Sequence, residues 1–384
     1  MMINRRAVTL GLAAVAAAGA GATWYLTRSK ARAMASPQTS PVALKPVVMG
    51  LDNPWGLAFL PDGTALVSER TGTLRRVDVT AAALSNPISG VPVVDSDGQG
   101  GLLGIALDPD FTTNRLVYMS FAEPGDEGNC TAVFRARLSD DAASLENGTV
   151  IFRQNRRAKS GHHFGSRLVF GRDGHLFVTT GERNVLRDQA QDPASHVGKV
   201  LRITRDGAPA PGNPELPGWA PEVWSIGHRN MQGAALHPDT GVLWTVEHGA
   251  RGGDEVNTPQ AGKNYGWPVI SYGREYSMLQ IGEGTAKAGM EQPLHYWDPS
   301  IAPSGMAFVM SDTYPGWKGS MLVGALAGQH ISRLSWEGET VVAEEQLFLG
   351  DTRFRDVVEG PDGRIYVLTD ASAPDGALMV ITAT

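Results

Sequence analysis

The chain has 384 residues, 42% of them apolar, with 46 glycines, 24 prolines and a formal net charge of −7. This is enough apolar material for a large core, and the glycine and proline content favours many short strands joined by tight turns over a helical fold. The acidic surface repels phosphate backbones, which excludes nucleic acid as an expected partner, and the single cysteine, Cys130, excludes an internal disulfide and a cysteine-rich metal site.

The beginning of the chain differs from the rest. Arg5-Arg6 precede an apolar run from 7 to 22, and two overlapping Ala-x-Ala motifs follow. This pattern predicts that residues 1–35 form an export signal of the twin-arginine type, with an uncleaved membrane anchor as the alternative. Removing this segment removes five basic residues and no acids, so 28 basic against 40 acidic residues leave a net charge of −12. We expect residues 36–384 to form one domain in the periplasm or outside the cell.

One sequence pattern recurs six times after this segment. Each copy has an apolar alternating strand, a turn of the Pro-Asp-Gly kind and a second alternating strand. Because one such sheet cannot bury both of its faces, stacking the sheets around an axis is the expected solution, with the surplus length in loops. The pattern predicts an all-β fold, a six-bladed β-propeller with antiparallel four-stranded blades and long loops over one face. The copies begin at Trp55, Leu103, Ser166, Gln232, Ser304 and Arg355.

The third copy lies in the stretch from Ser160 to Glu182, which holds the densest cluster of side chains able to do chemistry. Two alternating runs flank a turn at residues 172–174 and predict a β-hairpin. His162 and His163 stand just before its first strand. They would therefore lie at the mouth of the hairpin, where side chains can reach a ligand.

The longest departure from the repeat lies between Gly249 and Ser304. It shows little strand pattern, and its many tyrosines and tryptophans indicate an ordered loop. We expect this segment to fold over the mouth of the propeller.

Four polar clusters occupy the same place in their repeats, just before the first alternating strand. Equivalent positions of successive blades converge on one end of the central channel, so we expect these clusters to form one site. They span residues 97–103, 162–167, 227–232 and 353–356.

Three arginines, Arg229, Arg353 and Arg355, would meet in that site on an otherwise acidic protein. Converging guanidiniums need anionic compensation, and their planar forks suit carboxylates or phosphates, so the expected ligand is a polyanion. The alternative is that each arginine pairs with a local acid, such as Asp356 or Asp254.

His163 beside such an anion can act as a general base, because an imidazole titrates near neutral pH. Glu182 ends the hairpin that His163 begins, so it can return to hold the imidazole and stabilise its protonated form. The competing histidines are His162, His228 and His248.

A second cluster runs from Glu247 to Glu255 and is followed by Gly262–Trp267. Its glycine-rich backbone and nearby carboxylates suit a hard cation such as calcium, which takes oxygen ligands in loose geometry. Zinc is disfavoured because the sequence has neither a cysteine cluster nor His-x-x-x-His spacing.

From about Leu51 to Asp370 the chain resembles the soluble PQQ-dependent aldose sugar dehydrogenases, a family related to soluble quinoprotein glucose dehydrogenase. The fold of that family is a six-bladed β-propeller, in agreement with the repeat count. Seven motifs together carry the resemblance: GQGGLLGIALDPDF, HHFGSRLVF, GHRNMQG, EHGARGGDE, GKNYGWP, SIAPSGMAF and RFRDV.

The resemblance implies PQQ, a tricarboxylate quinone, bound with calcium at the channel mouth. His163 would be the base that takes the proton from the anomeric hydroxyl while hydride passes to the quinone. Arg229 would polarise the quinone and orient the sugar, and Glu182 would hold His163. The implied cofactor contacts are Gln99, His163, Arg229, Asn230, Arg353 and Arg355. The implied calcium ligands are the carbonyls of Gly249 and Ala250 at the cofactor, and Glu255 with the Tyr265 carbonyl at a second, structural ion.

Two positions depart from the family pattern. Ala250 stands where relatives usually have proline, which is tolerable if only the carbonyl binds metal. Ala327 stands where relatives usually carry a cofactor-binding lysine. Losing one cationic contact would cost about 1 kcal/mol of PQQ affinity where water reaches the site, and more where a carboxylate is left buried and unpaired.

The sequence therefore predicts an exported enzyme, a PQQ- and calcium-dependent quinoprotein that oxidises aldose sugars at C1 to the lactone. Its electrons would pass to an external acceptor, which is a quinone, a cytochrome or a dye. The alternatives are a calcium-dependent propeller lactonase or other hydrolase, and a non-catalytic propeller that binds a carbohydrate or a protein. A hydrolase would need carboxylates facing the metal rather than converging arginines. Contact with a membrane is expected only through an uncleaved N-terminal segment.

Overall fold

The computed structural model describes residues 34–384, which form six β-sheets and very little helix. Apart from one parallel edge strand, the sheets are antiparallel, and they are arranged as the six blades of a β-propeller, which confirms the predicted fold. The export signal or anchor predicted for residues 1–35 lies outside the described residues, apart from its last two positions. None of the helices in the described part is long and apolar enough to span a bilayer.

The first three blades have four strands each. Blade 1 consists of β3 (Pro54–Phe59), β4 (Ala65–Glu69), β5 (Thr73–Asp78) and β6 (Ala83–Leu84). Blade 2 consists of β7 (Leu102–Leu107), β8 (Leu116–Glu123), β9 (Cys130–Leu138) and β10 (Leu145–Arg153). Blade 3 consists of β11 (Gly165–Phe170), β12 (Leu176–Thr180), β13 (Lys199–Ile203) and β14 (Val223–Ile226). Two short helices, α2 (Phe111–Asn114) and the 3₁₀ helix η1 (Arg187–Gln191), lie in their loops.

The other three blades follow the same plan. Blade 4 consists of β15 (Met231–Leu236), β16 (Leu243–Glu247), β17 (Asp254–Asn257) and β18 (His295–Trp297). Blade 5 contains β19 (Pro303–Phe308), β20 (Met321–Ala325), β21 (His330–Glu337) and β22 (Thr340–Leu347). Blade 6 contains β23 (Phe354–Glu359), β24 (Ile365–Thr369), β25 (Gly376–Ala383) and, as its outer strand, β2 (Val42–Leu51).

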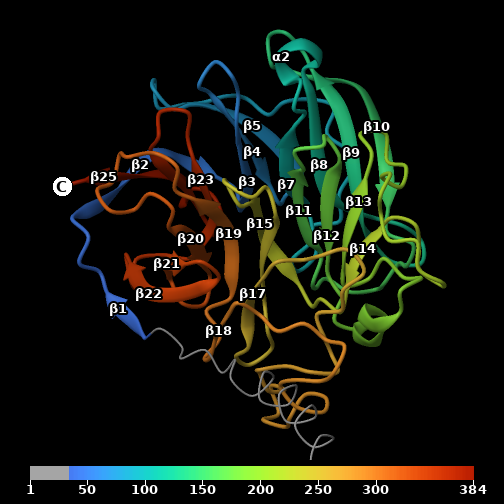
Figure 1. Cartoon of the computed structure of the whole chain (residues 1–384). Helices are drawn as coiled ribbons and strands as arrows, with labels where there is room; N and C mark the ends of the chain where they lie inside the picture. Colours follow the sequence, from blue (N-terminus) through green and yellow to red (C-terminus); the bar gives the residue numbers. More distant parts are fainter. Residues whose placement is uncertain (1–33) are drawn as a thin grey trace, which may run out of the picture. The chain divides into compact units, whose positions relative to one another are not determined.

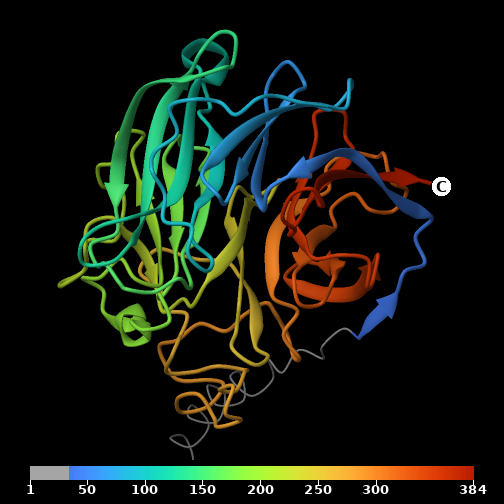
Figure 2. The same ribbon diagram turned by 180° about the vertical axis from the view of Figure 1, so that it is seen from behind.

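The innermost strands form a closed ring around the channel. Each of β3, β7, β11, β15, β19 and β23 contacts the next, and β23 contacts β3. The two ends of the chain close this ring, because β2 pairs with β25 from Val42 opposite Ala383 to Leu51 opposite Gly376. Figures 1 and 2 show the blue strand beside the red one near the C-terminus.

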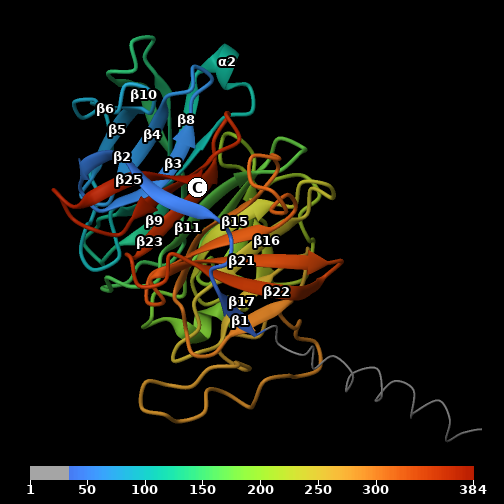
Figure 3. The same cartoon turned by 90° about the vertical axis from the view of Figure 1, so that its left-hand side faces the viewer.

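The segment before β2 adds a strand that the sequence did not predict. β1 (Ala35–Pro37) pairs in parallel with β22, so blade 5 has five strands where four were expected (Figure 3). The turn between β1 and β2 is fixed by Glu345, whose carboxylate accepts hydrogen bonds from the backbone N–H groups of Thr39 (2.5 Å) and Ser40 (2.7 Å).

The hydrophobic core lies between the faces of neighbouring blades. One cluster joins Tyr118 and Val133 of blade 2 to Leu168 and Leu176 of blade 3, and all four side chains are buried. The alternating pattern produces this arrangement, because successive side chains of a strand point to opposite faces and both faces of a blade meet a neighbour.

The aspartates of the repeated turns have a structural role. In three of the six copies the backbone N–H of the residue two positions later donates to the aspartate carboxylate, at 2.9 Å in Thr64 to Asp62, 3.0 Å in His175 to Asp173 and 3.1 Å in Arg364 to Asp362. This is the local bonding that makes aspartate a favoured turn residue. These three acids therefore fix the turns between the first and second strands of their blades.

The segment between Gly249 and Ser304 contains more strand than its sequence suggested, because it includes β17 and β18. The loop between them, residues 258–294, extends beyond the strands (Figure 3). Part of it, from Tyr265 to Ser271, lines a pocket at the mouth of the propeller, where the whole segment was expected to lie.

Candidate functional site

His163 and Glu182 meet at the mouth of the β11–β12 hairpin. His163 lies two residues before β11 and Glu182 two residues after β12, and Gly165 is paired with Thr180 between them. This pairing brings both buried side chains to one end of blade 3, where His163 Nδ1 is hydrogen-bonded to Glu182 Oε1. A carboxylate on Nδ1 selects the tautomer whose lone pair is on Nε2.

The backbone around His163 is held in an unusual conformation. Its φ of 55° lies in the left-handed region, which a non-glycine residue keeps only where its surroundings fix it. His163 N–H donates to Gln99 Oε1 at 3.0 Å, and a Cβ at Gly181 would stand 2.0 Å from the His163 carbonyl oxygen. Gln99 and Gly181 thus help to hold the imidazole in place.

The electrostatic surroundings keep the His163 imidazole neutral. Burial and the charge of Arg229 lower its pKa, while the hydrogen bond and charge of Glu182 act in the opposite direction and raise it. With the pKa below the ordinary imidazole value, the ring can accept a proton at neutral pH.

The competing histidines are differently placed. His228 is fully buried, and its two ring nitrogens lie 2.9 and 3.1 Å from neighbouring side chains. His162 is exposed. His248 lines the central cavity, and burial among positive charges holds its pKa well below the ordinary range. His228 also contacts a carboxylate, that of Glu247, but its second ring nitrogen is bonded to Ser225 Oγ, whereas the bond to Glu182 occupies only one ring nitrogen of His163.

Arg229 and Asn230 present buried donors without acceptors. Arg229 Nη1 donates to the carbonyl of His248 at 3.2 Å, and its guanidinium lies 5.1 Å from the centre of the Trp267 ring. Within residues 34–384, neither Arg229 Nε nor Asn230 Nδ2 has a hydrogen-bond partner. Buried donors are normally satisfied, so these two indicate a ligand that brings acceptors.

A cavity of about 220 Å³ opens at the same end of the channel. Three guanidiniums and one carboxylate line it, so the cavity has an excess of two positive charges. The charged residues are Arg70, Arg353, Arg355 and Asp370, and Gln99 and Gln232 add amide groups. Arg70 has no acid partner in the described part of the chain, and its Nε has no hydrogen-bond partner there.

Two of the predicted arginines do pair with an acid, but with a different one from those proposed. Arg353 and Arg355 share Asp370, with N–O distances of 2.8 and 2.9 Å. Asp356 instead pairs with Arg167 at 2.9 Å. Asp254 accepts from Ser300 and from three backbone N–H groups, among them that of Gly249 at 2.7 Å. The alternative pairing is therefore wrong in its partners, and one carboxylate serves two guanidiniums.

The predicted metal ligands lie beside this cavity. Gly249, Glu255 and Tyr265 line a second, much smaller pocket of about 10 Å³, enough for one water-sized particle. Burial and the neighbouring Glu247 carboxylate raise the pKa of Glu255 to about 8. A cation would stabilise the charged form of Glu255 here.

The remaining implied metal ligand is the backbone carbonyl of Ala250. Ala250 follows Gly249 and is buried in a cluster with Trp267. No group of three or more His, Cys, Asp and Glu side chains is placed to hold a metal in residues 34–384. A cation here would therefore depend on carbonyl oxygens for most of its ligands, as the resemblance implies.

Ala327 lies on the surface just after β20. Its N–H donates to the carbonyl of Ile301 at 3.0 Å, and the preceding Leu326 lines the central cavity. Blade 5 thus contributes apolar wall where the resemblance leads one to expect a cation.

The sequence interpretation did not assign Arg70, Asp370 or Trp55 to the cavity. A repeated signal was present, because an acid follows or ends the second strand in five of the six blades. These acids are Glu69, Glu123, Glu182, Glu247 and Asp370. Each acid has polar or charged partners near the same end of its blade. The six-fold sequence pattern that predicts the blades therefore also marks the position of the site.

The fold and this site together define an enzyme of the all-β propeller class, with a histidine–carboxylate pair beside a cationic cavity. Residues 51–380 match the model of a family described as Glucose / Sorbosone dehydrogenase. The chain belongs to this family.

Known proteins resemble the chain over most of its length. It is 46% identical over 330 residues to Aldose sugar dehydrogenase YliI of Escherichia coli (strain K12), covering 84% of this chain and 88% of the relative. A crystal structure of glucose dehydrogenase is 49% identical with a TM-score of 0.85, covering 89% of this chain and all of the other. The PQQ-bound form of Aldose Sugar Dehydrogenase from Streptomyces coelicolor is 32% identical with a TM-score of 0.75, covering 90% and 99%.

Proposed function

We propose that the chain is a PQQ- and calcium-dependent dehydrogenase that oxidises aldose sugars at C1 to the lactone. The observation that carries the proposal is the His163–Glu182 pair beside Arg229, at the mouth of a cavity with two excess positive charges. The relatives described as aldose sugar dehydrogenases, one of them PQQ-bound, support the same reaction class.

The residues present fit a tricarboxylate cofactor. Arg70, Arg353 and Arg355 offer guanidiniums from blades 1 and 6, and Asp370 neutralises only one of them. Arg229 Nε and Asn230 Nδ2 add buried donors that lack protein acceptors within the described residues. Charge-assisted hydrogen bonds to carboxylates would satisfy these groups.

The chain's own residues would handle the proton of the reaction. PQQ, when bound, would supply a quinone that takes the hydride from C1. His163 Nε2 would take the proton of the anomeric hydroxyl, and Glu182 would stabilise the imidazolium that forms. Arg229 would polarise the quinone and orient the sugar with its guanidinium.

Calcium is assigned to two places. The carbonyls of Gly249 and Ala250 would hold one ion at the cofactor, and Glu255 with the Tyr265 carbonyl would hold a structural one. The small pocket lined by three of these residues and the raised pKa of Glu255 support a cation there.

We also assign the protein to the periplasm or the exterior. Arg5-Arg6, the apolar run and the Ala-x-Ala motifs support export through a twin-arginine signal, with an uncleaved anchor as the alternative. Electrons would then leave the site to an external acceptor, which is a quinone, a cytochrome or a dye.

Reconstitution of the cofactor-free protein tests the proposal. PQQ and calcium are added together and separately, and dye reduction is followed with glucose and a panel of other aldoses. We expect saturable activity that requires both additions and a lactone as product. If PQQ does not bind at micromolar concentration, the hydrolase and the binding-module alternatives replace the proposal.

The variant His163→Ala separates catalysis from binding. It should abolish sugar oxidation and leave PQQ bound, because the imidazole acts on the sugar proton. Unchanged turnover would refute the assigned mechanism, and loss of PQQ binding with no other change would make His163 a cofactor ligand only.

A further inference from the structure

All six inner strands are irregular at the same place. The register between the inner strand and its neighbour shifts at this point in every blade. A β-bulge re-aims the side chain at its position, so one residue per blade can be turned toward the channel. The residues at or beside the six shifts are Gly56, Gly104, Arg167, Gly233, Gly305 and Asp356.

Four of these six residues are glycine for a steric reason. A Cβ at Gly233 would stand 2.3 Å from the carbonyl oxygen of Ser304 in the next blade. A Cβ at Gly305 would stand 2.0 Å from Asp356 Oδ1. Neighbouring inner strands thus approach too closely for a side chain in these blades, and one glycine makes room for the Asp356 carboxylate.

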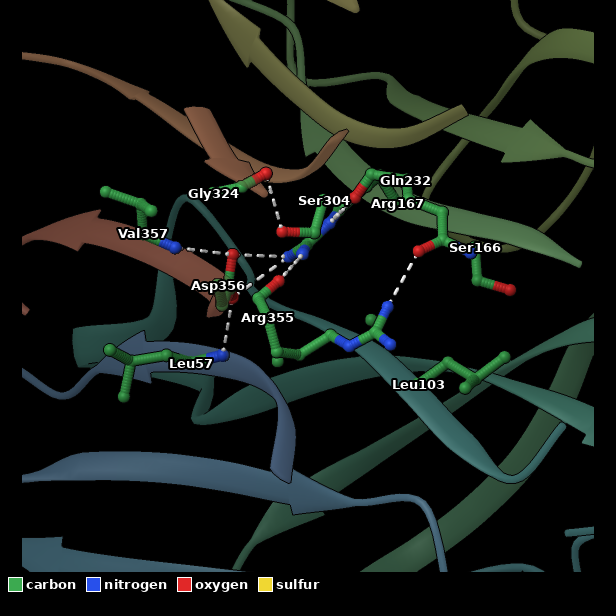
Figure 4. Close-up of polar contacts among 12 residues, drawn as sticks. Leu57, Leu103, Ser166, Arg167, Gln232, Ser304, Gly324, Arg355, Asp356 and Val357 are labelled. Atoms are coloured by element: carbon green, nitrogen blue, oxygen red, sulfur yellow. Dashed lines mark hydrogen bonds and ion pairs between the residues drawn. The ribbon is translucent and has the colours of Figure 1, made fainter. Parts of the chain in front are cut away.

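The two other positions carry opposite charges on opposite blades. Arg167 belongs to blade 3 and Asp356 to blade 6, which are three steps apart in either direction around the ring. Their side chains meet at 2.9 Å, so the ion pair spans the channel (Figure 4). We call Arg167 and Asp356 the cross-channel pair.

The Arg167 side chain touches three other blades. Nε donates to the backbone carbonyl of Gln232 at 2.5 Å, and Nη2 donates to that of Arg355 at 3.5 Å. The guanidinium also lies 4.3 Å from the centre of the Trp55 ring. All three of these partners line the central cavity, whereas Arg167 does not.

Asp356 and the cavity residues complete the arrangement. Asp356 is buried and accepts from the backbone N–H of Leu57 in blade 1 at 3.1 Å. Beside the pair, Arg355 Nη1 donates to Gln232 Oε1 at 2.7 Å (Figure 4). The backbones of Gln232 and Arg355 are therefore bonded to Arg167, and their side chains are bonded to each other.

We propose that the cross-channel pair positions Gln232, Arg355 and Trp55 for anion binding in the central cavity, as well as joining blades 1, 3, 4 and 6. Arg167 and Asp356 are positioning residues rather than catalytic residues, because they act through these three neighbours. The inference rests on the proposed function only in taking PQQ as the anion. Loss of the pair therefore weakens PQQ binding even at temperatures at which the variant stays folded.

The test compares PQQ dissociation constants of the full chain and its variants, measured by quenching of tryptophan fluorescence well below each melting temperature. The variants are Arg167→Met, Asp356→Asn and Arg167→Lys. We expect the first two to weaken PQQ binding by about tenfold or more, because the anion site loses its alignment. Arg167→Lys keeps the charge but not the fork that reaches Gln232 and Asp356 together, so its effect should be intermediate.

Blade 5 offers a matched control where it contacts the turn between β1 and β2. Arg333 forms a similarly buried pair with Glu345 at 2.8 Å and lies 5.4 Å from the Trp317 ring, away from the cavity. Arg333→Met should lower the melting temperature and leave PQQ binding unchanged. Equal weakening in Arg333→Met and Arg167→Met would overturn the inference, as would PQQ affinity in Arg167→Met within twofold of the parent chain. If Arg167→Met does not fold, Arg167→Lys decides by the same criterion.

Two further readouts separate this inference from the proposed function. If the parent chain does not bind PQQ, the proposed function fails, and crystal structures of the variants then decide the inference without ligand. The contact between Arg355 and Gln232 should be lost in Arg167→Met, and its retention would contradict positioning. Where PQQ does bind, Arg167→Met should weaken PQQ binding less in the Arg355→Lys variant than in the parent chain. The reason is that both substitutions act on the same group, the Arg355 guanidinium.

Discussion

At the scale of single residues, the His163–Glu182 pair determines how the rate should depend on pH. The neutral imidazole is the form that accepts a proton, and its pKa lies below the ordinary value. We expect kcat/KM of the parent enzyme to fall only at pH values below that ordinary pKa. In Glu182→Gln the carboxylate that raises the pKa is gone, so this acidic limb should move to still lower pH.

The same variant should be slower. The imidazolium formed during the reaction loses its partner, so kcat should fall by about 100-fold or more. The pH–rate profiles of both proteins provide the measurement. A limb that moves to higher pH, or an unchanged kcat, would contradict the assigned role of Glu182.

A second residue-scale prediction concerns Arg70. Arg70→Gln should weaken PQQ binding by about tenfold or more, because a charged hydrogen bond to a carboxylate is lost. The fold should tolerate the change, since Arg70 has no acid partner in residues 34–384 and no buried carboxylate is left unpaired. Arg76→Gln is the control, as Arg76 lies in the same blade and faces Asp62 at the surface. Equal PQQ affinity in both variants would remove Arg70 from the cofactor site.

The site residues show what sequence reasoning can and cannot reach. His163, Glu182 and Arg229 were found because the repeat places each of them at the same end of its blade. The acid that holds Arg353 and Arg355 was not found, because Asp356 is nearer to them in sequence than Asp370. The register shift in β23 sends the Asp356 side chain to Arg167, and a one-residue shift of this kind leaves no mark in the hydrophobic pattern.

At the scale of elements, we expect the β16–β17 hairpin of blade 4 to couple metal binding to pH. The pKa of Glu255, about 8, lies above its ordinary value of 4.5. A carboxyl whose pKa is raised in the folded state contributes its stability below the ordinary value and loses it as the pH rises toward 8. We expect the melting temperature of the calcium-free protein to fall by a few degrees between about pH 5 and pH 8.

Added calcium should restore the melting temperature mainly at the higher pH, because it replaces the proton on Glu255. Thermal melts with calcium and with a chelator at both pH values provide the test. Glu255→Gln should lose both the pH dependence and the calcium response. A calcium effect of equal size in that variant would place the ion elsewhere.

Elements were predictable where their pattern is local. The inner strands and the Pro-Asp-Gly turns alternate or repeat within a few residues, and their positions were predicted from the sequence. β1, β2, β17 and β18 were not, because their existence depends on partners that the local pattern does not show. β2 pairs with residues more than 300 positions away, and β18 has only three residues.

At the scale of the whole molecule, closure of the ring by β2 should decide whether the propeller folds. A chain that begins at Asp52 lacks β2 and leaves β25 as an open edge, so we expect no cooperative thermal transition and a strong tendency to aggregate. Of the described elements, a chain that begins at Pro41 lacks only β1 and its turn, and it should fold with a lower melting temperature. Melting followed by far-ultraviolet circular dichroism distinguishes the two. Cooperative melting of the shorter chain would show that five complete blades and a three-stranded sixth suffice.

The pairing of β2 with β25 also sets the order of events during synthesis. Residues 42–51 leave the ribosome before any other strand of blade 6, while their partner, Gly376–Ala383, ends one residue before the C-terminus. β2 must therefore wait, unpaired, until its partner more than 300 positions later has been made. A chain that stops before residue 376 has no partner for β2 in blade 6, so its ring cannot close.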